Sequence, residues 1–247
     1  MSVYAEPKFL CSGESCLVVE FADEVNMGAN ASVQALRHLV NAHLSPRVIR
    51  ECVPTYRSLS INFDPLLMEW DDLIGRVKKL LTQSCADMLS VREVVELPVC
   101  YGGEYGPDLE SVAAHTKLSV EEVVKRHTSR PYYCYMLGFT PGYPYLGGMD
   151  ESLSVPRLPS PRTHIPMGTV AIAGTQTGVY PIVSPGGWQL LGRTPLRLFD
   201  PKANPVTLIQ AGEWVRFIPV SEEEYLSVEN RVQQGTYTVH RTKEAHA

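Results

Sequence analysis

The stretch that decides the fold is TVAIAGTQTGVYPIVSPGGWQLLG, from Thr169 to Gly192. Short runs rich in Val, Ile, Tyr and Thr alternate in it with Gly and Pro clusters. Helical periodicity is absent from Pro131 onward, and runs of the same kind recur as PYYCYML, LRLFD, VTLI and WVRFIP. Many short strands separated by turns are typical of a barrel or a sandwich. We therefore predict a mainly β domain over residues 98–247, with a tail after Gln233 that frays.

The first 97 residues show a different order of elements. Apolar runs predict strands at Cys16–Phe21, Arg47–Val53, Ser58–Phe63 and Val91–Val99. Two helical patterns lie between them. One is capped by Asn30, and the other runs from Trp70 to Leu81 with acidic residues in its first turn. The order β-α-β-β-α-β predicts a small ferredoxin-like α+β domain over residues 1–97.

A glycine-rich turn, YGGEYGPD from Tyr101 to Asp108, leads into two short predicted helices. Asp108 is suited to cap the first helix. Ser119 and Glu122 form an S-x-x-E capping box for the second, which ends near His127.

Composition narrows the class of protein. The chain has 247 residues, 44% of them hydrophobic, and a net charge of −5, so it has no general attraction to nucleic acid. The first ten residues hold no long apolar run, and we expect a cytoplasmic protein. Six cysteines are scattered without a C-x-x-C pair or a histidine partner, so no metal site is predicted. We interpret them as small buried hydrophobes, Cys134 above all.

Four blocks rich in Gly and Pro lie within the β region, and polar residues are set among them. They are GFTPGYPYLGG (Gly138–Gly148), PRLPSPR (Pro156–Arg162), IPMGTVAIAG (Ile165–Gly174) and QTGVYPIVSPGGWQLLGRTPLRLFDP (Gln176–Pro201). Glycine lets a ligand approach the main chain and proline stiffens a loop, so the blocks predict rigid loops with exposed amides. The alternative is that they are only the tight turns of a small barrel.

In this order and spacing the blocks resemble the signature of the KipI and allophanate-hydrolase-subunit-1 family, closely from Tyr101 to Pro219. Departures are mild, such as Tyr143 where the family usually has Phe. The resemblance implies a small α/β domain followed by a cyclophilin-like barrel. It also implies a subunit of an enzyme that hydrolyses 5-oxoproline to glutamate with ATP and Mg²⁺, active with a KipA-type C subunit and a LamB/YcsF-type A subunit.

Opening an unreactive lactam with ATP requires donors for phosphate oxygens and positioned groups rather than a strong nucleophile. Arg157, Arg162 and Arg193 offer planar donors for a phosphate or for the substrate carboxylate, although a surface ion pair is the simpler interpretation of Arg162. Trp188 offers a flat wall for a ring, or is the largest core residue of the barrel. His127 suits acid–base chemistry, or interacts as a cation with the end of its helix.

Two sets of site residues follow. The catalytic set is His127, Arg193 and Gln176. The substrate-binding set is Tyr143, Arg157, Tyr180, Ser184, Gly186, Gly187 and Trp188. Tyr180 is about as well suited to the core as to a site.

No complete nucleotide motif is present. The segment GWQLLGRT, Gly187 to Thr194, has P-loop spacing, but it reads as a strand and Pro195 blocks a following helix. If ATP is used, its site is therefore expected between subunits or in a loop specific to this fold. Two other functions stay open within the resemblance, an inhibitor that docks on a sensor histidine kinase and a carboxyltransferase component related to urea amidolyase.

Overall fold

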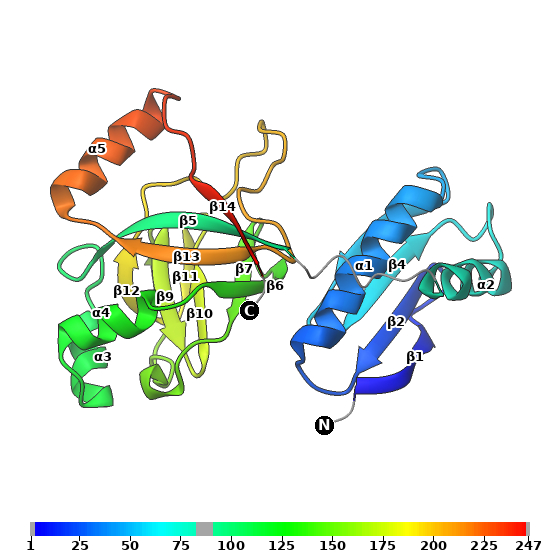
Figure 1. Ribbon diagram of the computed structural model, residues 1–247, viewed down its shortest axis with the longest axis horizontal. Coiled ribbons are helices and arrows are strands. Elements are labelled where there is room, and N and C mark those ends of the chain that lie inside the picture. The colour runs from blue at the N-terminus through cyan, green and yellow to red at the C-terminus, as the bar shows by residue number, and fades with distance from the viewer. Residues whose placement is uncertain (1–2, 83–90, 246–247) are drawn as a thin grey trace. The chain divides into compact units, whose positions relative to one another are not determined.

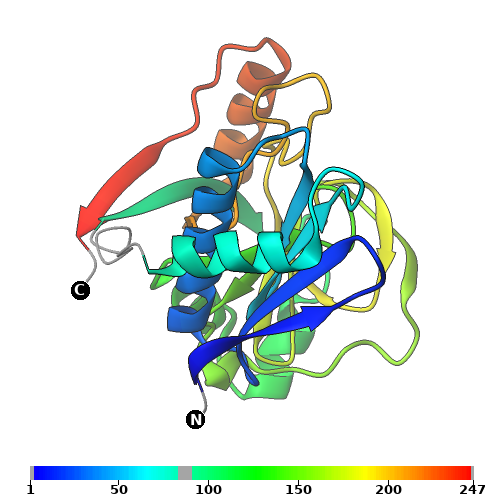
Figure 2. The ribbon, with the colours of Figure 1, turned by 90° about the vertical axis from the view of Figure 1, so that its right-hand side faces the viewer.

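The computed structural model describes residues 3–82 and 91–245. It divides into two compact units, Met1–Val91 with Ala245–Ala247, and Arg92–Glu244. The first unit is an antiparallel sheet in the order β1-β2-β4-β3, and α1 packs against β2, β3 and β4 (Figures 1 and 2). Its elements are β1 (Val3–Cys11), β2 (Cys16–Ala22), α1 (Met27–His43), β3 (Ile49–Pro54), β4 (Ser58–Phe63) and α2 (Trp70–Leu81).

Strict alternation builds the core of this unit. Leu59, Ile61 and Phe63 of β4 are fully buried, while the residues between them are half-buried. Helix α1 begins earlier than predicted. Asn26, not Asn30, is the N-cap and accepts the Ala29 N–H. Asn30 lies inside the helix, where it is buried and donates to two loop carbonyls. Asn30, which was predicted as the cap, therefore connects the helix to the loop before β4.

The second unit is a barrel of mixed strands. Its sheet order is β12-β9-β10-β7-β6-β13-β5, a further β12–β5 pairing closes the ring, and β14 extends β5 (Figure 1). The barrel strands are β5 (Val91–Tyr101), β6 (Tyr132–Gly138), β7 (Tyr143–Gly147), β9 (Thr169–Ala173), β10 (Gln176–Val179), β12 (Gln189–Arg193) and β13 (Trp214–Pro219). The other elements are α3 (Leu109–Thr116), α4 (Val120–Thr128), η2 (Glu151–Leu153), β8 (Arg162–Ile165), β11 (Ser184–Gly186), α5 (Glu222–Gln233) and β14 (Arg241–Ala245).

The barrel wall has an inner and an outer apolar layer. Val170 and Ile172 of β9 point into the main core, while Ala171 and Ala173 between them point outward. The short β8–β11 sheet packs over that outer face, because Ile165 of β8 joins Ala171 and Ala173 in one cluster. The outer face of β9 and β10 is therefore covered by protein and supports the candidate site.

The predicted fold class is confirmed, an α+β unit followed by a mainly β barrel, but one strand was assigned to the wrong sheet. The strand predicted at Val91–Val99 belongs to the barrel, where β5 runs parallel to β13. The fourth strand of the first sheet is the unpredicted β1. The strand at Val91–Val99 was assigned to the wrong sheet because of its burial. Residues 97–100 are all buried, without alternation, as in a strand that is covered on both faces. The expected boundary at residue 97 falls inside this strand.

The prediction for the C-terminal part was also wrong, because it expected only strands followed by a fraying tail. Helix α5 begins with a capping box in which Ser221 and Glu224 bind each other's backbone N–H. After it, β14 pairs with β5, and Glu244 of β14 accepts from Arg92 and Arg216. This ion-paired strand holds the segment that was expected to fray.

Candidate functional site

An aromatic row lies on the outer face of the barrel wall. Tyr143 of β7 contacts Tyr180 and Trp188 edge to face, with ring centroids 5.4 and 6.0 Å apart. All three rings are at most 7% exposed. The small outward residues of β9 make room for them. The predicted substrate-binding residues Tyr143, Tyr180 and Trp188 are therefore brought together, and the rings also form part of the core, as the alternative interpretation had it.

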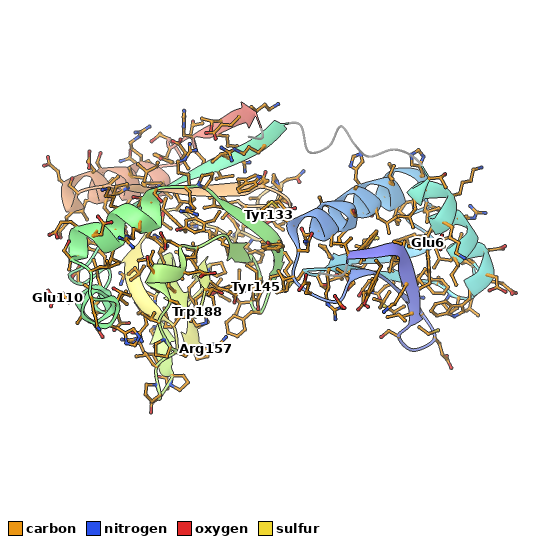
Figure 3. All side chains as sticks on the ribbon, turned by 60° about the horizontal axis from the view of Figure 1, so that its bottom comes forward. Glu6, Glu110, Tyr133, Tyr145, Arg157 and Trp188 are labelled. Carbon is orange, nitrogen blue, oxygen red and sulfur yellow. The ribbon has the colours of Figure 1, made fainter. Side chains whose placement is uncertain are left out.

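Arg157 lies at one end of this row. Its guanidinium is 6.0 Å from the centroid of the Trp188 ring, and Figure 3 shows the two side chains together. The backbone sets this position, since Leu158 N–H donates to Gly187 O at 2.7 Å. The Arg157 side chain is exposed and forms no hydrogen bond or ion pair with any residue in 3–82 or 91–245. A cation held on an aromatic face with all its donors available suits an oxyanion.

Glycines allow the tyrosine hydroxyls to approach the backbone. A Cβ on Gly186 would lie 2.2 Å from the Tyr180 hydroxyl, whereas one on Gly187 would meet nothing closer than 3.6 Å. The Tyr180 oxygen accepts the Trp188 N–H, and burial raises the pKa of this phenol against the opposing effect of that bond and two arginines. Gly186 is therefore required by close packing, and Tyr180 remains a neutral donor at physiological pH.

Arg162 lies beside Gly186, and an ion pair with Asp108 fixes its guanidinium. One of its nitrogens donates to Asp108 Oδ1 at 2.7 Å, and Asp108 Oδ2 accepts the Leu190 N–H at 2.7 Å. The other terminal nitrogen, Nη1, is buried without a hydrogen-bond partner among the described residues. The ion pair favoured from the sequence is confirmed. Asp108, however, makes no side-chain bond that caps α3, because its carboxylate is used in this clamp.

Gln176 and Ser184 are near the row but not part of it. Gln176 pairs with Ala173, so its side chain projects from the outer face that carries the aromatic rings. Ser184 is buried, and the bond that its hydroxyl makes to a described residue is a long one, 3.4 Å to Ile182 O. Gln176 is the better placed of the two for a polar contact with a bound molecule.

Arg193 lies apart from these residues. It ends β12, five residues after Trp188, which is roughly 16 Å at about 3.3 Å per residue. Its guanidinium is 5.6 Å from the Tyr105 ring and makes one long bond to Glu104 O. The structure therefore does not bring Arg193 together with Arg157.

His127 is on the other side of the wall, inside the barrel. It is fully buried and stacks on Phe217 at 4.7 Å between ring centroids. Its ring nitrogens bond the Tyr101 hydroxyl at 2.7 Å and Thr177 Oγ1 at 2.8 Å. Burial lowers the pKa of His127 to about 3, so the ring is neutral and the expected cation at the helix end is absent. These contacts give His127 a structural role rather than acid–base chemistry with a bound molecule.

Two features of the loop before β7 were missed from the sequence. Phe139 has a positive φ of 59° and is 65% exposed, and its ring lies 5.6 Å from that of Tyr143. Next to it, Thr140 Oγ1 is buried without a partner among the described residues. The sequence signal, an aromatic residue between Gly138 and a Thr-Pro pair, was present but has no periodicity to interpret.

Other chemistry is sparse in the parts of the chain that the structure describes. No group of three or more His, Cys, Asp or Glu side chains is placed to hold a metal ion. Cys134 is fully buried, as predicted, and burial raises the pKa of its thiol. None of the helices in these parts is long and apolar enough to cross a membrane.

The barrel, its covered outer face and the Gly–Pro loops define a recognised class of domain. Residues 7–209 match the family described as "Carboxyltransferase domain, subdomain C and D", and the chain belongs to this family. It is 44% identical over 223 residues to the B subunit of 5-oxoprolinase from Bacillus subtilis (strain 168), which covers 86% of the chain and 92% of that protein. It is 40% identical to the protein of the same name from Escherichia coli O157:H7, over 85% of the chain and 94% of that protein. The resemblance inferred from the four blocks is confirmed.

Two solved structures have a similar fold. The structure of TTHA0988 is 37% identical with a TM-score of 0.75, and covers 83% of this chain but only 40% of its own length. The Kluyveromyces lactis urea amidolyase is 20% identical with a TM-score of 0.74, covering 96% of this chain and 16% of its own, which shows a shared fold. This chain therefore corresponds to one part of some longer proteins.

Proposed function

We propose that this protein is the B subunit of an ATP-dependent 5-oxoprolinase, which hydrolyses 5-oxoproline to glutamate. The observation that carries this proposal is the extent of the match. The relatives from Bacillus subtilis and Escherichia coli, both named as the B subunit of 5-oxoprolinase, align over 92% and 94% of their own length. Both units of this chain therefore have their counterparts in proteins of that name.

The outer-face site supplies anion recognition in this proposal. Within the described parts of the chain, Arg157 presents a guanidinium without competing partners, and Arg162 is fixed by Asp108 with one nitrogen unused. Guanidinium groups bind carboxylate and phosphate oxygens through paired hydrogen bonds. We assign Arg157 to the carboxylate of 5-oxoproline or to a phosphate oxygen, with Trp188 as the wall beside it.

The chain contributes binding and orientation rather than a nucleophile. Phosphorylation of the lactam oxygen by ATP lets water add to the ring carbon, after which the C–N bond breaks and phosphate leaves. Such a reaction depends on positioned donors. Gln176, on the same outer face, is the amide we assign to the substrate, while Arg193 and His127 lie elsewhere.

Partners complete the proposed enzyme. We expect a KipA-type C subunit and a LamB/YcsF-type A subunit, with the active site shared between chains. The described residues offer no cluster for Mg²⁺, so no step is assigned to the ion here. Because the reaction consumes ATP, the proposed location is the cytoplasm.

Reconstitution tests the function. This chain is purified with both partner subunits, and glutamate release from 5-oxoproline is measured with and without ATP. We expect ATP-dependent release only from the complete mixture. A complete mixture that assembles yet releases no glutamate would exclude the proposal.

A second function is favoured by the description of the family itself, which names a carboxyltransferase domain. Transfer of a carboxyl group from a biotin carrier to a urea-like acceptor would use the same anion-binding residues. Isotope transfer from carboxybiotin, assayed with the same subunits, separates the two. Glutamate release without carboxyl transfer supports the 5-oxoprolinase.

A further inference from the structure

A short segment, residues 155–158, carries Arg157 past the ends of β9 and β12. Val155 is 3% exposed and packs in the core inside the barrel, and it pairs with Gly174, the residue after β9. Further along the segment, Arg157 lies over the Trp188 ring on the outer face. The segment therefore passes from the barrel interior to the candidate site, and its backbone decides where the Arg157 side chain begins.

Backbone hydrogen bonds hold the two ends of this segment. Gly174 N–H donates to Val155 O at 2.7 Å. At the other end, Leu158 N–H donates to Gly187 O, also at 2.7 Å. Pro156 between them has no N–H and contributes only a carbonyl oxygen to hydrogen bonding. These two bonds leave the peptide group that follows Pro156 to be fixed by another donor.

The side chain of Gln189 supplies that donor. Its Nε2 donates to Pro156 O at 3.1 Å. A carbonyl oxygen only accepts hydrogen bonds, so the amino end of the Gln189 amide faces the segment. The Pro156 carbonyl and the Arg157 N–H belong to one planar peptide group. The bond from Gln189 therefore fixes the backbone from which the Arg157 side chain extends.

Trp188 and Gln189 hold Arg157 from two sides. Trp188 belongs to the outer aromatic cluster, and its ring lies 6.0 Å from the guanidinium (Figure 3). Gln189 is the first residue of β12 and is paired with Ile172, which lies in the core inside the barrel. Residues paired across two strands share a face of the sheet, so Gln189 extends from the inner face. The ring therefore supports the cation, while the amide holds the backbone.

We propose that Gln189 is a positioning residue for substrate binding, which acts by holding the Arg157 backbone so that the guanidinium lies over Trp188. The inference rests on the proposed function, in which Arg157 binds the anionic group of the substrate. An exposed arginine loses conformational freedom when it binds an anion, and this loss weakens binding. Holding its backbone in advance reduces the loss. Gln189 itself does not need to touch the substrate.

The test removes the bond and keeps the fold. Gln189→Met keeps the length of the side chain without its donor. Gln189→Asn keeps the amide but is one methylene shorter, so it does not reach Pro156 O. Gln210→Met is the matched control, because the Gln210 amide also donates to a backbone carbonyl, that of Thr207, at 2.8 Å. Each full-length variant is assembled with both partner subunits to measure kcat and KM for 5-oxoproline, and its thermal midpoint is measured alone.

A double variant identifies the residue through which Gln189 acts. We expect both Gln189 variants to raise the KM for 5-oxoproline by about 3- to 10-fold and to leave kcat within about twofold, as a loss of ground-state binding implies. In the Arg157→Gln background, Gln189→Met should raise KM no further, because the guanidinium that it positions is already absent. Gln210→Met should keep the wild-type KM, and every variant should keep a cooperative thermal transition.

A wild-type KM in both Gln189 variants overturns the inference alone, and so does a further rise of KM in the double variant. An equal rise of KM in Gln210→Met also overturns it, because KM would then follow a general loosening of the loops. If the wild-type assembly releases glutamate and Arg157→Gln leaves KM unchanged, the assignment of Arg157 fails and the inference fails with it. If the wild-type assembly releases no glutamate, the proposed function is wrong, and the inference falls as well.

Discussion

Replacement of His127 by Phe tests whether this histidine is a neutral core residue. The ring keeps its stacking on Phe217, but both hydrogen bonds are lost. Thr177 Oγ1 retains a bond to Ala171 O, whereas the Tyr101 hydroxyl loses the partner shown for it. A buried polar group left unpaired costs about 1–3 kcal/mol, so we expect the free energy of unfolding at pH 7.5 to fall by about 2–3 kcal/mol.

The pH dependence gives the sharper result. Burial lowers the pKa of His127 to about 3 in the folded chain, while an unfolded histidine titrates near about 6.5. Between these values the unfolded state binds a proton that the folded state does not. The stability from this group is therefore complete above about pH 6.5 and is lost as the pH falls toward 3, by up to ~1.4 kcal/mol per pH unit.

From pH 7.5 to pH 5.0 the wild type should lose about 2 kcal/mol through His127, a loss that His127→Phe cannot show. The difference between the two proteins should thus shrink to about 1 kcal/mol or less at pH 5.0. Urea unfolding of both proteins at the two pH values measures it. Titration of the carboxylates changes the unfolding free energy of both proteins equally, so it cancels in the difference between them. A difference that stays constant between the two pH values would refute a buried neutral histidine.

Four other substitutions, one of them a control, probe the outer-face site. Arg157→Gln should leave the unfolding free energy within about 0.5 kcal/mol, yet raise the KM for 5-oxoproline of the reconstituted enzyme by about 10- to 100-fold. An unchanged KM excludes Arg157 from binding. Gly186→Ala should cost about 1–3 kcal/mol in urea unfolding because the new methyl group meets the Tyr180 hydroxyl, whereas Gly187→Ala should be nearly neutral. Asp108→Ala leaves a backbone amide and a guanidinium unpaired, so a loss of about 2–4 kcal/mol is expected. Equal effects of the two glycine changes, or an unaffected Asp108 variant, would contradict these contacts.

Local patterns predicted most elements but not their partners. The helix at Trp70–Leu81 and the strand at Ser58–Phe63 have the predicted bounds, because each is specified by its own periodicity. The strand starting at Val91 was predicted as an element and placed in the wrong sheet. Its partner β13 lies more than 100 residues later, and pairing over that distance leaves no trace in a local window.

Helix α5 was missed for a different reason. Its signal was in the sequence, since Ser221 and Glu224 form a capping box, but the apolar stripe behind them is weak. Only Tyr225 of this helix is buried. A helix that depends on caps more than on a buried face is easily missed among strands.

By itself, the sequence determined the class of each unit, the family and the Gly–Pro loops, because turn chemistry and the order of the blocks are local properties. The tertiary structure decided which side chains meet. Gln176 and Thr177 are neighbours in one strand, yet one projects from the outer face with the aromatic rings and the other bonds His127 inside the barrel. Successive residues of a strand point to opposite faces, and only the folded barrel fixes which face is inside.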